Sequence, residues 1–335
     1  MELVKPRRIG EGDTIGLIAP SQSAAYIEPR VWQIGLDRLR SLGLEVRVGE
    51  HAMEHTGHTA GSVENRLSDL TAFLEDDEVA AIMTVFGGYN SNQLLHHIDY
   101  DLVRKVRKVF VGYSDITAMN NAFLSKSGLV NFSGPAFVSF CQPDLPRYTI
   151  DRFLELVRGD KEVVTVRASE QWAEDLWFEK EDLGPREWMM NPGWKVLNGG
   201  KVSGRAVGGN LNTLLLLSGT EFWPDLDGAV LFLEEDDHES PATIDRNLTH
   251  LRHLGAFDRI SGLVLGRFPS AVGFNEEDHL SSMITNLKID KHVPIVSEVD
   301  LSHTDPLMTV PLGIATELDC EEGCIRFLEK AVTER

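Results

Sequence analysis

The sequence predicts an α/β protein with a parallel sheet in its N-terminal half and a second domain after it. In that half, short apolar runs alternate with segments whose apolar residues recur at helical spacing, which is typical of a parallel sheet. The length of 335 residues is long for one hydrophobic core, so two domains are expected. We expect an N-terminal α/β domain at 1–160, a connecting segment at 161–201 and a C-terminal domain at 202–335.

Composition and charge exclude several kinds of partner. The formal net charge of -20 argues against nucleic acid and anionic membranes, because both are bound by basic surfaces. No apolar run approaches the ~20 residues of a membrane span. The first twelve residues are charged and lack an apolar signal core, and Cys141, Cys320 and Cys324 show no paired spacing. A cytoplasmic protein without disulfides is therefore expected.

The N-terminal half reads as alternating strands and helices. The expected strands cover 14–19, 44–48, 79–85 and 109–111, and the helices cover 29–42, 62–75 and 92–97. Parallel sheets bind ligands beyond the carboxyl ends of their strands. Gly87-Gly88 follows the third strand and Ser114 follows the fourth, so these two loops are expected to meet in one crevice.

Ser114 lies at a sharp corner between a strand and a helix. The strand stops at Gly112, and a helix with apolar residues at Ile116 and Met119 starts at Asp115. Such a corner exposes a side chain above the sheet and leaves free N–H groups that can stabilise a developing negative charge. The pattern is that of a nucleophile elbow, except that Ile116 stands where the second glycine of G-x-S-x-G belongs. An ordinary helix N-cap is the competing interpretation.

The connecting segment has little periodicity and is rich in tryptophan. It holds Trp172, Trp177, Trp188 and Trp194 among many acidic residues. One interpretation is a linker whose aromatic rings fill a seam between domains. The other is a substrate loop that offers aromatic faces to a planar ligand. The sequence leaves both open.

The C-terminal domain is expected to contain further strands and two helices. The strands cover 202–207, 229–233, 262–265, 293–297, 307–310, 314–318 and 325–328, the helices cover 211–217 and 241–254, and Gly208-Gly209-Asn210 forms a turn.

An activated serine needs a base, and the base needs a carboxylate to orient it. His303 follows an expected strand in a Ser-His-Thr-Asp-Pro turn, and Glu234 ends a buried strand, where an unpaired carboxylate is costly. The competing interpretations are a turn histidine bonded to the backbone and the start of a solvated acidic loop. The chain order of serine, acid and histidine is that of α/β-hydrolases.

Metal and nucleotide-cofactor sites have less support. His51, His55 and His58 share one loop, but that loop offers no cysteine. The acidic run 234–239 lacks the glycine turn of a calcium-binding loop. Neither G-x-G-x-x-G nor a Walker A pattern occurs. We therefore expect neither a metal nor an organic cofactor.

Three separated motifs resemble the LD-carboxypeptidase family of serine peptidases. They are Gly112-Tyr113-Ser114-Asp115-Ile116-Thr117, Leu231-Phe232-Leu233-Glu234 and Ser302-His303-Thr304. Matches at 59–62, 208–211 and 311–313 extend the resemblance over about residues 13–327. The resemblance implies a flavodoxin-like N-terminal domain, a swivelling C-terminal β/α domain and a homodimer.

The resemblance also implies functional residues. The triad would be Ser114, Glu234 and His303, with the backbone N–H groups of Gly88 and Asp115 as the oxyanion hole. The implied substrate-binding residues are Gly87, Tyr89, Asn90, Asn210, Trp177, Trp188 and Trp194.

The implied reaction is hydrolysis of an amide at the carboxyl side of an acyl group. Phe86 stands where murein LD-carboxypeptidases tend to have arginine, and the following Gly-Gly-Tyr-Asn-Ser-Asn resembles the microcin C immunity branch. In that branch an aromatic loop packs around an adenine, so a peptidyl or aminoacyl nucleotide is the expected substrate. The alternatives are a murein LD-carboxypeptidase that removes D-Ala from tetrapeptides and a non-catalytic protein that binds small ligands on the same scaffold.

Overall fold

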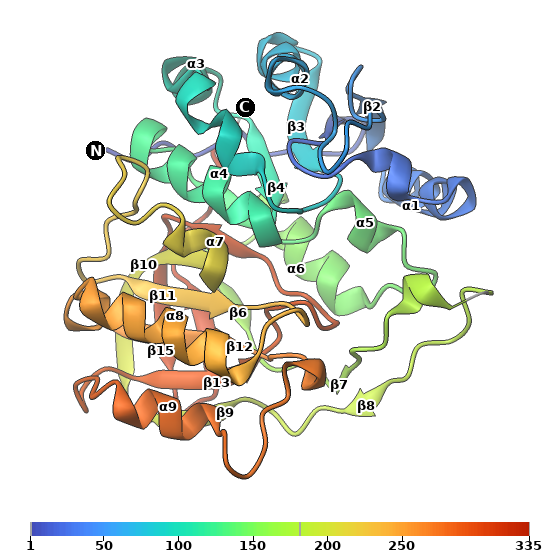
Figure 1. The fold of residues 1–335 in the computed structure, drawn as a ribbon. Coiled ribbons are helices and arrows are strands. Elements are labelled where there is room, and N and C mark those ends of the chain that lie inside the picture. The colour runs from blue at the N-terminus through green and yellow to red at the C-terminus, as the bar shows by residue number, and fades with distance from the viewer. Residues whose placement is uncertain (1, 181, 335) are drawn as a thin grey trace.

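The computed structural model describes residues 2–180 and 182–334 and contains two large β-sheets flanked by helices (Figure 1). The strands of the N-terminal sheet are β1 (Thr14–Ile18), β2 (Glu45–Val48), β3 (Val79–Thr84), β4 (Val109–Gly112), β5 (Asn131–Ser133) and β14 (Val310–Leu312). Their order is β14-β5-β4-β3-β1-β2, and every neighbouring pair is parallel except β14 with β5. The predicted α/β class is confirmed.

The C-terminal sheet combines parallel and antiparallel strands. Its members are β6 (Val164–Val166), β9 (Lys195–Asn198), β10 (Lys201–Asn210), β11 (Val230–Glu234), β12 (Gly262–Gly266), β13 (Ile295–Val299), β15 (Ala315–Asp319) and β16 (Cys324–Phe327). They follow the order β6-β16-β15-β10-β11-β12-β13-β9, in which β10 to β13 run parallel. The connecting segment adds a small pair, β7 (Gln171–Trp172) with β8 (Met189–Met190), at one side of the molecule (Figure 1).

Helices link the strands of both sheets. The α-helices of the N-terminal half are α1 (Pro29–Ser41), α2 (Val63–Glu75), α3 (Tyr100–Val106), α4 (Thr117–Ala122), α5 (Phe137–Phe140) and α6 (Arg147–Arg158). Those of the C-terminal half are α7 (Leu211–Leu215), α8 (Pro241–His253) and α9 (Leu280–Asn286). Within the described ranges, none of these helices has the length and apolar content that a membrane crossing requires.

Local sequence explains where several helices begin. Pro29 occupies the first turn of α1, where its missing N–H costs nothing, and the carboxylate of Glu28 accepts two backbone N–H groups of that turn. The Ser62 hydroxyl caps α2 by accepting the N–H of Asn65. Ser240 and Thr243 form a reciprocal capping box at the start of α8.

The predicted turn at Gly208-Gly209-Asn210 is wrong, because β10 continues through it. Gly208 and Gly209 have φ angles of +117° and +135°, which side-chain-bearing residues rarely adopt. A Cβ on Gly208 would collide with the carbonyl oxygen of Phe232 in β11. The glycines therefore allow two strands to approach closely, and the pairing places Asn210 opposite Glu234.

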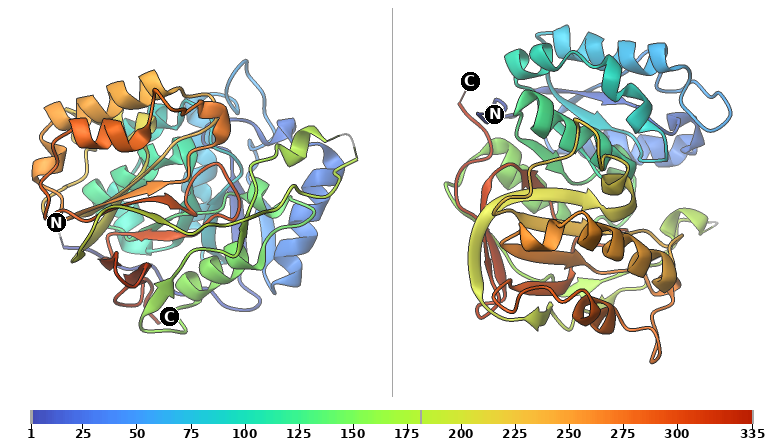
Figure 2. Two further views of the ribbon diagram at one scale, coloured as in Figure 1. Left: turned by 90° about the horizontal axis from the view of Figure 1, so that it is seen from below. Right: turned by 60° about the vertical axis from the view of Figure 1, so that its left-hand side comes forward.

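Other elements differ from the prediction in smaller ways. The expected helix at 92–97 is a 3-10 helix, Ser91–His97, and α3, α5 and α6 were not anticipated. The expected strand at 307–310 lies at 310–312 and joins the N-terminal sheet, so the chain crosses back between the two halves. The segments near the two ends of the chain are also in contact, since Arg7 and Thr333 form a β-bridge, and the right-hand view of Figure 2 shows the red C-terminal segment running up beside the N-terminal half.

Candidate active site

Ser114 occupies a strained corner directly after β4. Its φ of +62° lies in the left-handed region, which is uncommon for a residue with a side chain. A 3-10 turn, Ser114–Ile116, starts at the same residue and leads into α4. The Ser114 hydroxyl lies 3.1 Å from Nε2 of His303. A serine that only caps a helix would not need this imidazole partner. The backbone thus has the shape of a nucleophile elbow.

A hydrogen-bonded chain connects Ser114, His303 and Glu234. Nε2 of His303 lies 3.1 Å from the Ser114 Oγ, and Nδ1 lies 2.8 Å from Oε2 of Glu234. Glu234 is only 2% exposed, and the Ser302 hydroxyl also donates to it at 3.3 Å. Ser114 comes from the N-terminal sheet, whereas the other two residues come from the C-terminal half. The chain therefore spans the seam between the two halves.

The acidic neighbours of His303 raise its pKa. Burial, the largest single effect, lowers the pKa, but the charge and hydrogen bond of Glu234, together with the charges of Asp236 and Glu235, outweigh burial and raise the pKa to about 9. Burial, followed by the charge of Glu234, raises the pKa of Glu235 to about 8. Glu235 faces away from the histidine, because its oxygens accept the Asn210 Nδ2 at 2.9 Å and the Asn212 N–H at 2.6 Å.

The glycine loop after β3 keeps the space beside the serine open. A Cβ on Gly87 would lie 2.9 Å from the Ser114 Oγ and 3.3 Å from the backbone N of Asp115. The carboxylate of Asp115 is held by the N–H of Ser91 at 2.8 Å. Because Asp115 lies in the first turn of a helix, its own N–H has no intrahelical acceptor. Gly88 follows with a φ of +135°.

The hydroxyl of Ser21 holds this loop in place through hydrogen bonds. Ser21 was not among the residues predicted from the sequence. Ser21 is 1% exposed and accepts the backbone N–H groups of Tyr89 at 3.1 Å and Asn90 at 3.0 Å. The buried Arg66 donates to the carbonyl oxygen of Asn90 at 3.3 Å. One signal could have identified Ser21: it follows β1 at the same edge of the sheet where Gly88 follows β3.

The predicted substrate-binding residues have different environments. Tyr89 is 73% exposed next to the glycine loop, whereas Asn210 is buried and caps α7 by accepting the N–H of Thr213. Trp177 is 6% exposed and packs in the hydrophobic core. The connecting segment also exposes apolar side chains, namely Leu176, Phe178, Met189, Met190 and Val196.

The half-buried tryptophans of the connecting segment are held by aspartates. The indole N–H of Trp188 donates to Asp144 at 3.1 Å, and that of Trp194 donates to Asp300 at 3.3 Å. Asp144 lies in the N-terminal half and Asp300 in the C-terminal half, so the two rings attach the segment to both. The segment is anchored as a linker would be, and it also presents apolar groups to solvent.

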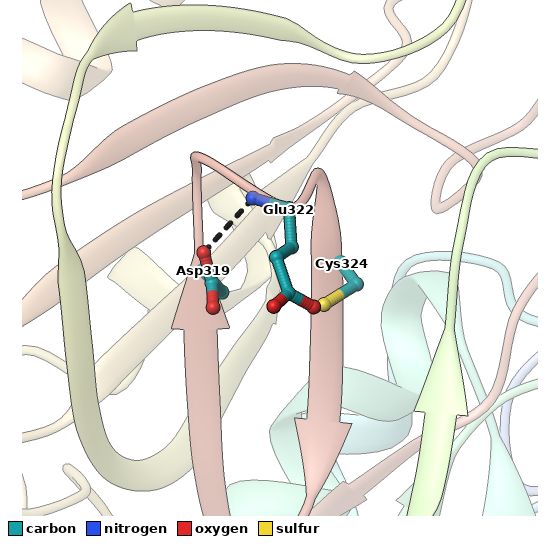
Figure 3. Close-up of side chains that lie close together, drawn as sticks. All are labelled: Asp319, Glu322 and Cys324. Carbon is teal, nitrogen blue, oxygen red and sulfur yellow. Dashed lines mark hydrogen bonds between the residues drawn. The ribbon is translucent and has the colours of Figure 1, made fainter.

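The turn between β15 and β16 gathers Asp319, Glu322 and Cys324, whose potential ligand atoms lie within 4.8 Å of one another (Figure 3). Asp319 already accepts the N–H of Glu322 at 3.0 Å and pairs with Lys201 at 3.1 Å and Arg326 at 3.3 Å. These contacts lower its pKa to about 2. Burial raises the pKa of the Cys324 thiol. An ion-paired turn with a protonated thiol accounts for this cluster.

Two of the three histidines at 51–58 have other partners. Nδ1 of His51 lies 2.7 Å from the carboxylate of Glu54, and His55 contacts the hydroxyl of Tyr26. Within residues 2–180 and 182–334, no group of three metal-ligating side chains includes a histidine.

Comparison with known proteins agrees with this arrangement. Residues 15–134 match the LD-carboxypeptidase N-terminal domain, and residues 203–318 match the LD-carboxypeptidase C-terminal domain. The chain belongs to the LD-carboxypeptidase family of serine peptidases. The resemblance inferred from the sequence motifs is thereby confirmed, and with it the assignment of this LD-carboxypeptidase family member as a hydrolase.

Relatives cover almost the whole chain. A protein of Treponema pallidum (strain Nichols) that is named as a carboxypeptidase is 35% identical over 96% of this chain and 94% of its own length. The microcin C7 self-immunity protein MccF of Escherichia coli is 31% identical over 95% of this chain and 94% of its own. A probable murein peptide carboxypeptidase of Bacillus subtilis (strain 168) is 31% identical over 98% and 96%.

Solved structures show the same two-domain architecture. An MccF-like protein from Bacillus anthracis str. Ames superposes with a TM-score of 0.92 at 36% identity, covering 97% of this chain and 99% of that one. MccF in complex with aspartyl sulfamoyl adenosine superposes with a TM-score of 0.90 at 30% identity, covering 98% and 100%. The predicted two-domain fold is confirmed.

Proposed function

We propose that this LD-carboxypeptidase family member hydrolyses the amide of a peptidyl or aminoacyl nucleotide by acyl transfer to Ser114. The observation that carries the proposal is the hydrogen-bonded chain from Ser114 through His303 to Glu234, with distances of 3.1 and 2.8 Å. A serine hydroxyl, an imidazole and a buried carboxylate in this order are the parts that activate a serine nucleophile.

In the first step, Oγ of Ser114 attacks the acyl carbon while Nε2 of His303 takes the hydroxyl proton. The carbon–nitrogen bond then breaks, and His303 gives this proton to the leaving nitrogen. Water attacks the resulting acyl-enzyme with His303 again as base, and the serine is restored. Glu234 holds the proton on Nδ1 and stabilises the charged imidazole, in line with the pKa of about 9.

The oxyanion of each tetrahedral intermediate would bind between two backbone N–H groups. Asp115 and Gly88 supply them, one from the elbow and one from the glycine loop. Support comes from the open space at Gly87, where even a methyl group would crowd the serine. Each such donor contributes about 3 kcal/mol to the transition state in comparable hydrolases.

The proposed substrate class rests on similarity and on the connecting segment. MccF, at 30% identity, has been solved with aspartyl sulfamoyl adenosine. In this chain, Phe178 and Met190 are 59% and 75% exposed, which suits contact with a planar base. A cytoplasmic homodimer belongs to the same proposal, and sedimentation of the purified protein would measure its oligomeric state.

The test is turnover measured by mass spectrometry. Wild type and Ser114→Ala are each offered aspartyl sulfamoyl adenosine and a murein tetrapeptide, with Ser282→Ala as a control because Ser282 is an exposed serine on α9. We expect wild type and the control to release sulfamoyl adenosine, and Ser114→Ala to release none. Release of D-Ala alone would replace the substrate class by murein peptides. A folded wild type that cleaves neither compound and leaves Ser114 unlabelled by a fluorophosphonate would refute the mechanism in favour of a binding protein.

A further inference from the structure

The turn that carries His303 is attached at both of its ends. At one end, the Ser302 hydroxyl donates to the carbonyl oxygen of Glu235 at 2.7 Å, which ties the turn to the end of β11. At the other end, the backbone N–H and carbonyl of Asp305 pair with those of Ala173, each at 2.8 Å. The second attachment is made by the connecting segment. The connecting segment and the histidine turn are therefore joined directly by backbone hydrogen bonds.

Arg186 lies at this second attachment. Its side chain is 2% exposed, and Nη1 donates to Oδ2 of Asp305 at 2.8 Å and to Oε1 of Gln142 at 2.5 Å. Nε donates to Oδ1 of Asp175 at 3.0 Å. Gln142 closes the ring by donating to the other oxygen of Asp305 at 3.0 Å. The planar guanidinium has donors in fixed directions, so it can serve all three partners at once.

The three partners of Arg186 come from three parts of the protein. Gln142 follows α5 in the N-terminal half, Asp175 belongs to the connecting segment, and Asp305 lies two residues after His303. The hydrogen bond between Ser114 and His303 spans the same seam, so its length depends on how the histidine turn sits against the N-terminal half. Arg186 and Gln142 hold that turn in place.

We infer that Arg186 is a positioning residue that acts on His303 through Asp305. Arg186 keeps the imidazole within hydrogen-bond distance of Ser114. It also makes the distance between His303 and Ser114 depend on the position of the connecting segment. The inference rests on the proposed function, because it needs Ser114 to be the nucleophile and His303 the base. A displacement of the base by about 1 Å lowers the rate of such a reaction on the order of 100-fold.

The experiment measures reaction of Ser114 with a fluorophosphonate, which reports on the serine–histidine pair without knowledge of the natural substrate. The maximal inactivation rate and the half-saturating concentration are determined separately for wild type, Arg186→Gln and Asp305→Asn. Lys180→Gln is the matched control, since Lys180 pairs with the same Asp175 at 2.8 Å without contacting Asp305.

We expect Arg186→Gln and Asp305→Asn each to lower the maximal rate by about 30- to 100-fold with little change in half-saturation. The double variant should be no slower than the slower single variant, because both changes remove the same contact between Arg186 and Asp305, through which Arg186 acts on His303. Lys180→Gln should react like wild type. If Arg186→Gln does not fold, the maximal rate of Asp305→Asn alone tests the inference.

Two results would overturn the inference. One is a maximal rate equal to that of wild type in the folded variants, with only the melting temperature lowered, which is the behaviour of a structural ion pair. The other is an equal loss in Lys180→Gln. A wild type that is not labelled at all would instead reject the proposed function, so the two failures are distinguishable.

Discussion

Replacing Glu234 with glutamine should change the pKa of His303 and, with it, the pH dependence of the reaction. The carboxylate lies 2.8 Å from Nδ1 and holds the pKa at about 9, although burial alone would lower it below the ordinary 6.5. Without that charge the pKa should fall towards its ordinary value, because only the smaller effects of Asp236 and Glu235 then oppose burial; a fall from 9 to 6.5 is a difference of 9 − 6.5 = 2.5, or about 3 kcal/mol.

The sign of the effect follows from the proposed role of His303 as a base. In wild type, His303 is charged at neutral pH, so the rate should rise about tenfold per pH unit and level off near pH 9. In Glu234→Gln the midpoint of this rise should move down towards about pH 6.5, so the profile should be nearly flat above about pH 7.5. The plateau itself should drop by up to about 10⁴-fold, because glutamine does not hold the same tautomer.

The assay is the rate of fluorophosphonate labelling from about pH 6 to pH 10, together with the histidine Cε1 signal in NMR, assigned with a His303→Gln variant. Glu235→Gln is the control, because Glu235 has a raised pKa of about 8 but faces Asn210. A pH limb that stays near 9 in Glu234→Gln, or that disappears in Glu235→Gln instead, would refute the reasoning.

Three further substitutions test the glycine loop beside Ser114, the support of that loop by Ser21, and the close approach of β10 to β11. Gly87→Ala would place a methyl group 2.9 Å from the serine oxygen, so labelling should slow by about 10²- to 10³-fold while the melting temperature stays nearly constant; an unchanged rate would contradict the proposed oxyanion geometry. Ser21→Ala removes the acceptor of two half-buried backbone N–H groups and should lower the free energy of unfolding by about 1–3 kcal/mol, measured with urea; a loss below that range would show that water replaces the hydroxyl. Gly208→Ala should cost several kcal/mol, because the methyl group collides with Phe232, whereas Gly219→Ala, which has a φ of +76° and open space, should cost only about 1 kcal/mol; equal melting temperatures would show that β10 and β11 can separate freely.

Much of the candidate site could be predicted because its residues follow strands. Glu234 ends β11 and His303 follows β13, so both lie at the carboxyl edge of the parallel strands of the C-terminal sheet, and Ser114 follows β4 at the corresponding edge of the N-terminal sheet. That the two edges face each other is seen only in the folded chain. The expected turn at 208–210 failed for a related reason. Consecutive glycines usually indicate a turn. Here they occur because Phe232 in the neighbouring strand approaches the backbone too closely for a side chain.

Contacts between distant residues left little signal in the sequence: the position of Ser21 after β1 was the only pointer to it, and Arg186 had none. Ser21 meets the glycine loop 68 residues later, and Arg186 meets Gln142 and Asp305 across 44 and 119 residues. An isolated arginine in an acidic segment looks like one half of a solvated ion pair. Only the folded chain shows that its side chain is 2% exposed and has partners on three sides. Such buried networks depend on tertiary packing, which hydrophobic periodicity does not describe.

The strand β14 has a consequence for how the protein is made. It pairs with β5 through Val310 and Ser133, which are 310 − 133 = 177 residues apart. During synthesis, the β5 edge of the sheet that carries Ser114 therefore stays open until β14, at residues 310–312, has emerged from the ribosome. Open edges recruit strands from other chains, so a fragment that ends before β14 should aggregate even though it contains the entire nucleophile elbow. The two halves look separable as layers, but β14, which is made after most of the C-terminal half, joins them into one folding unit.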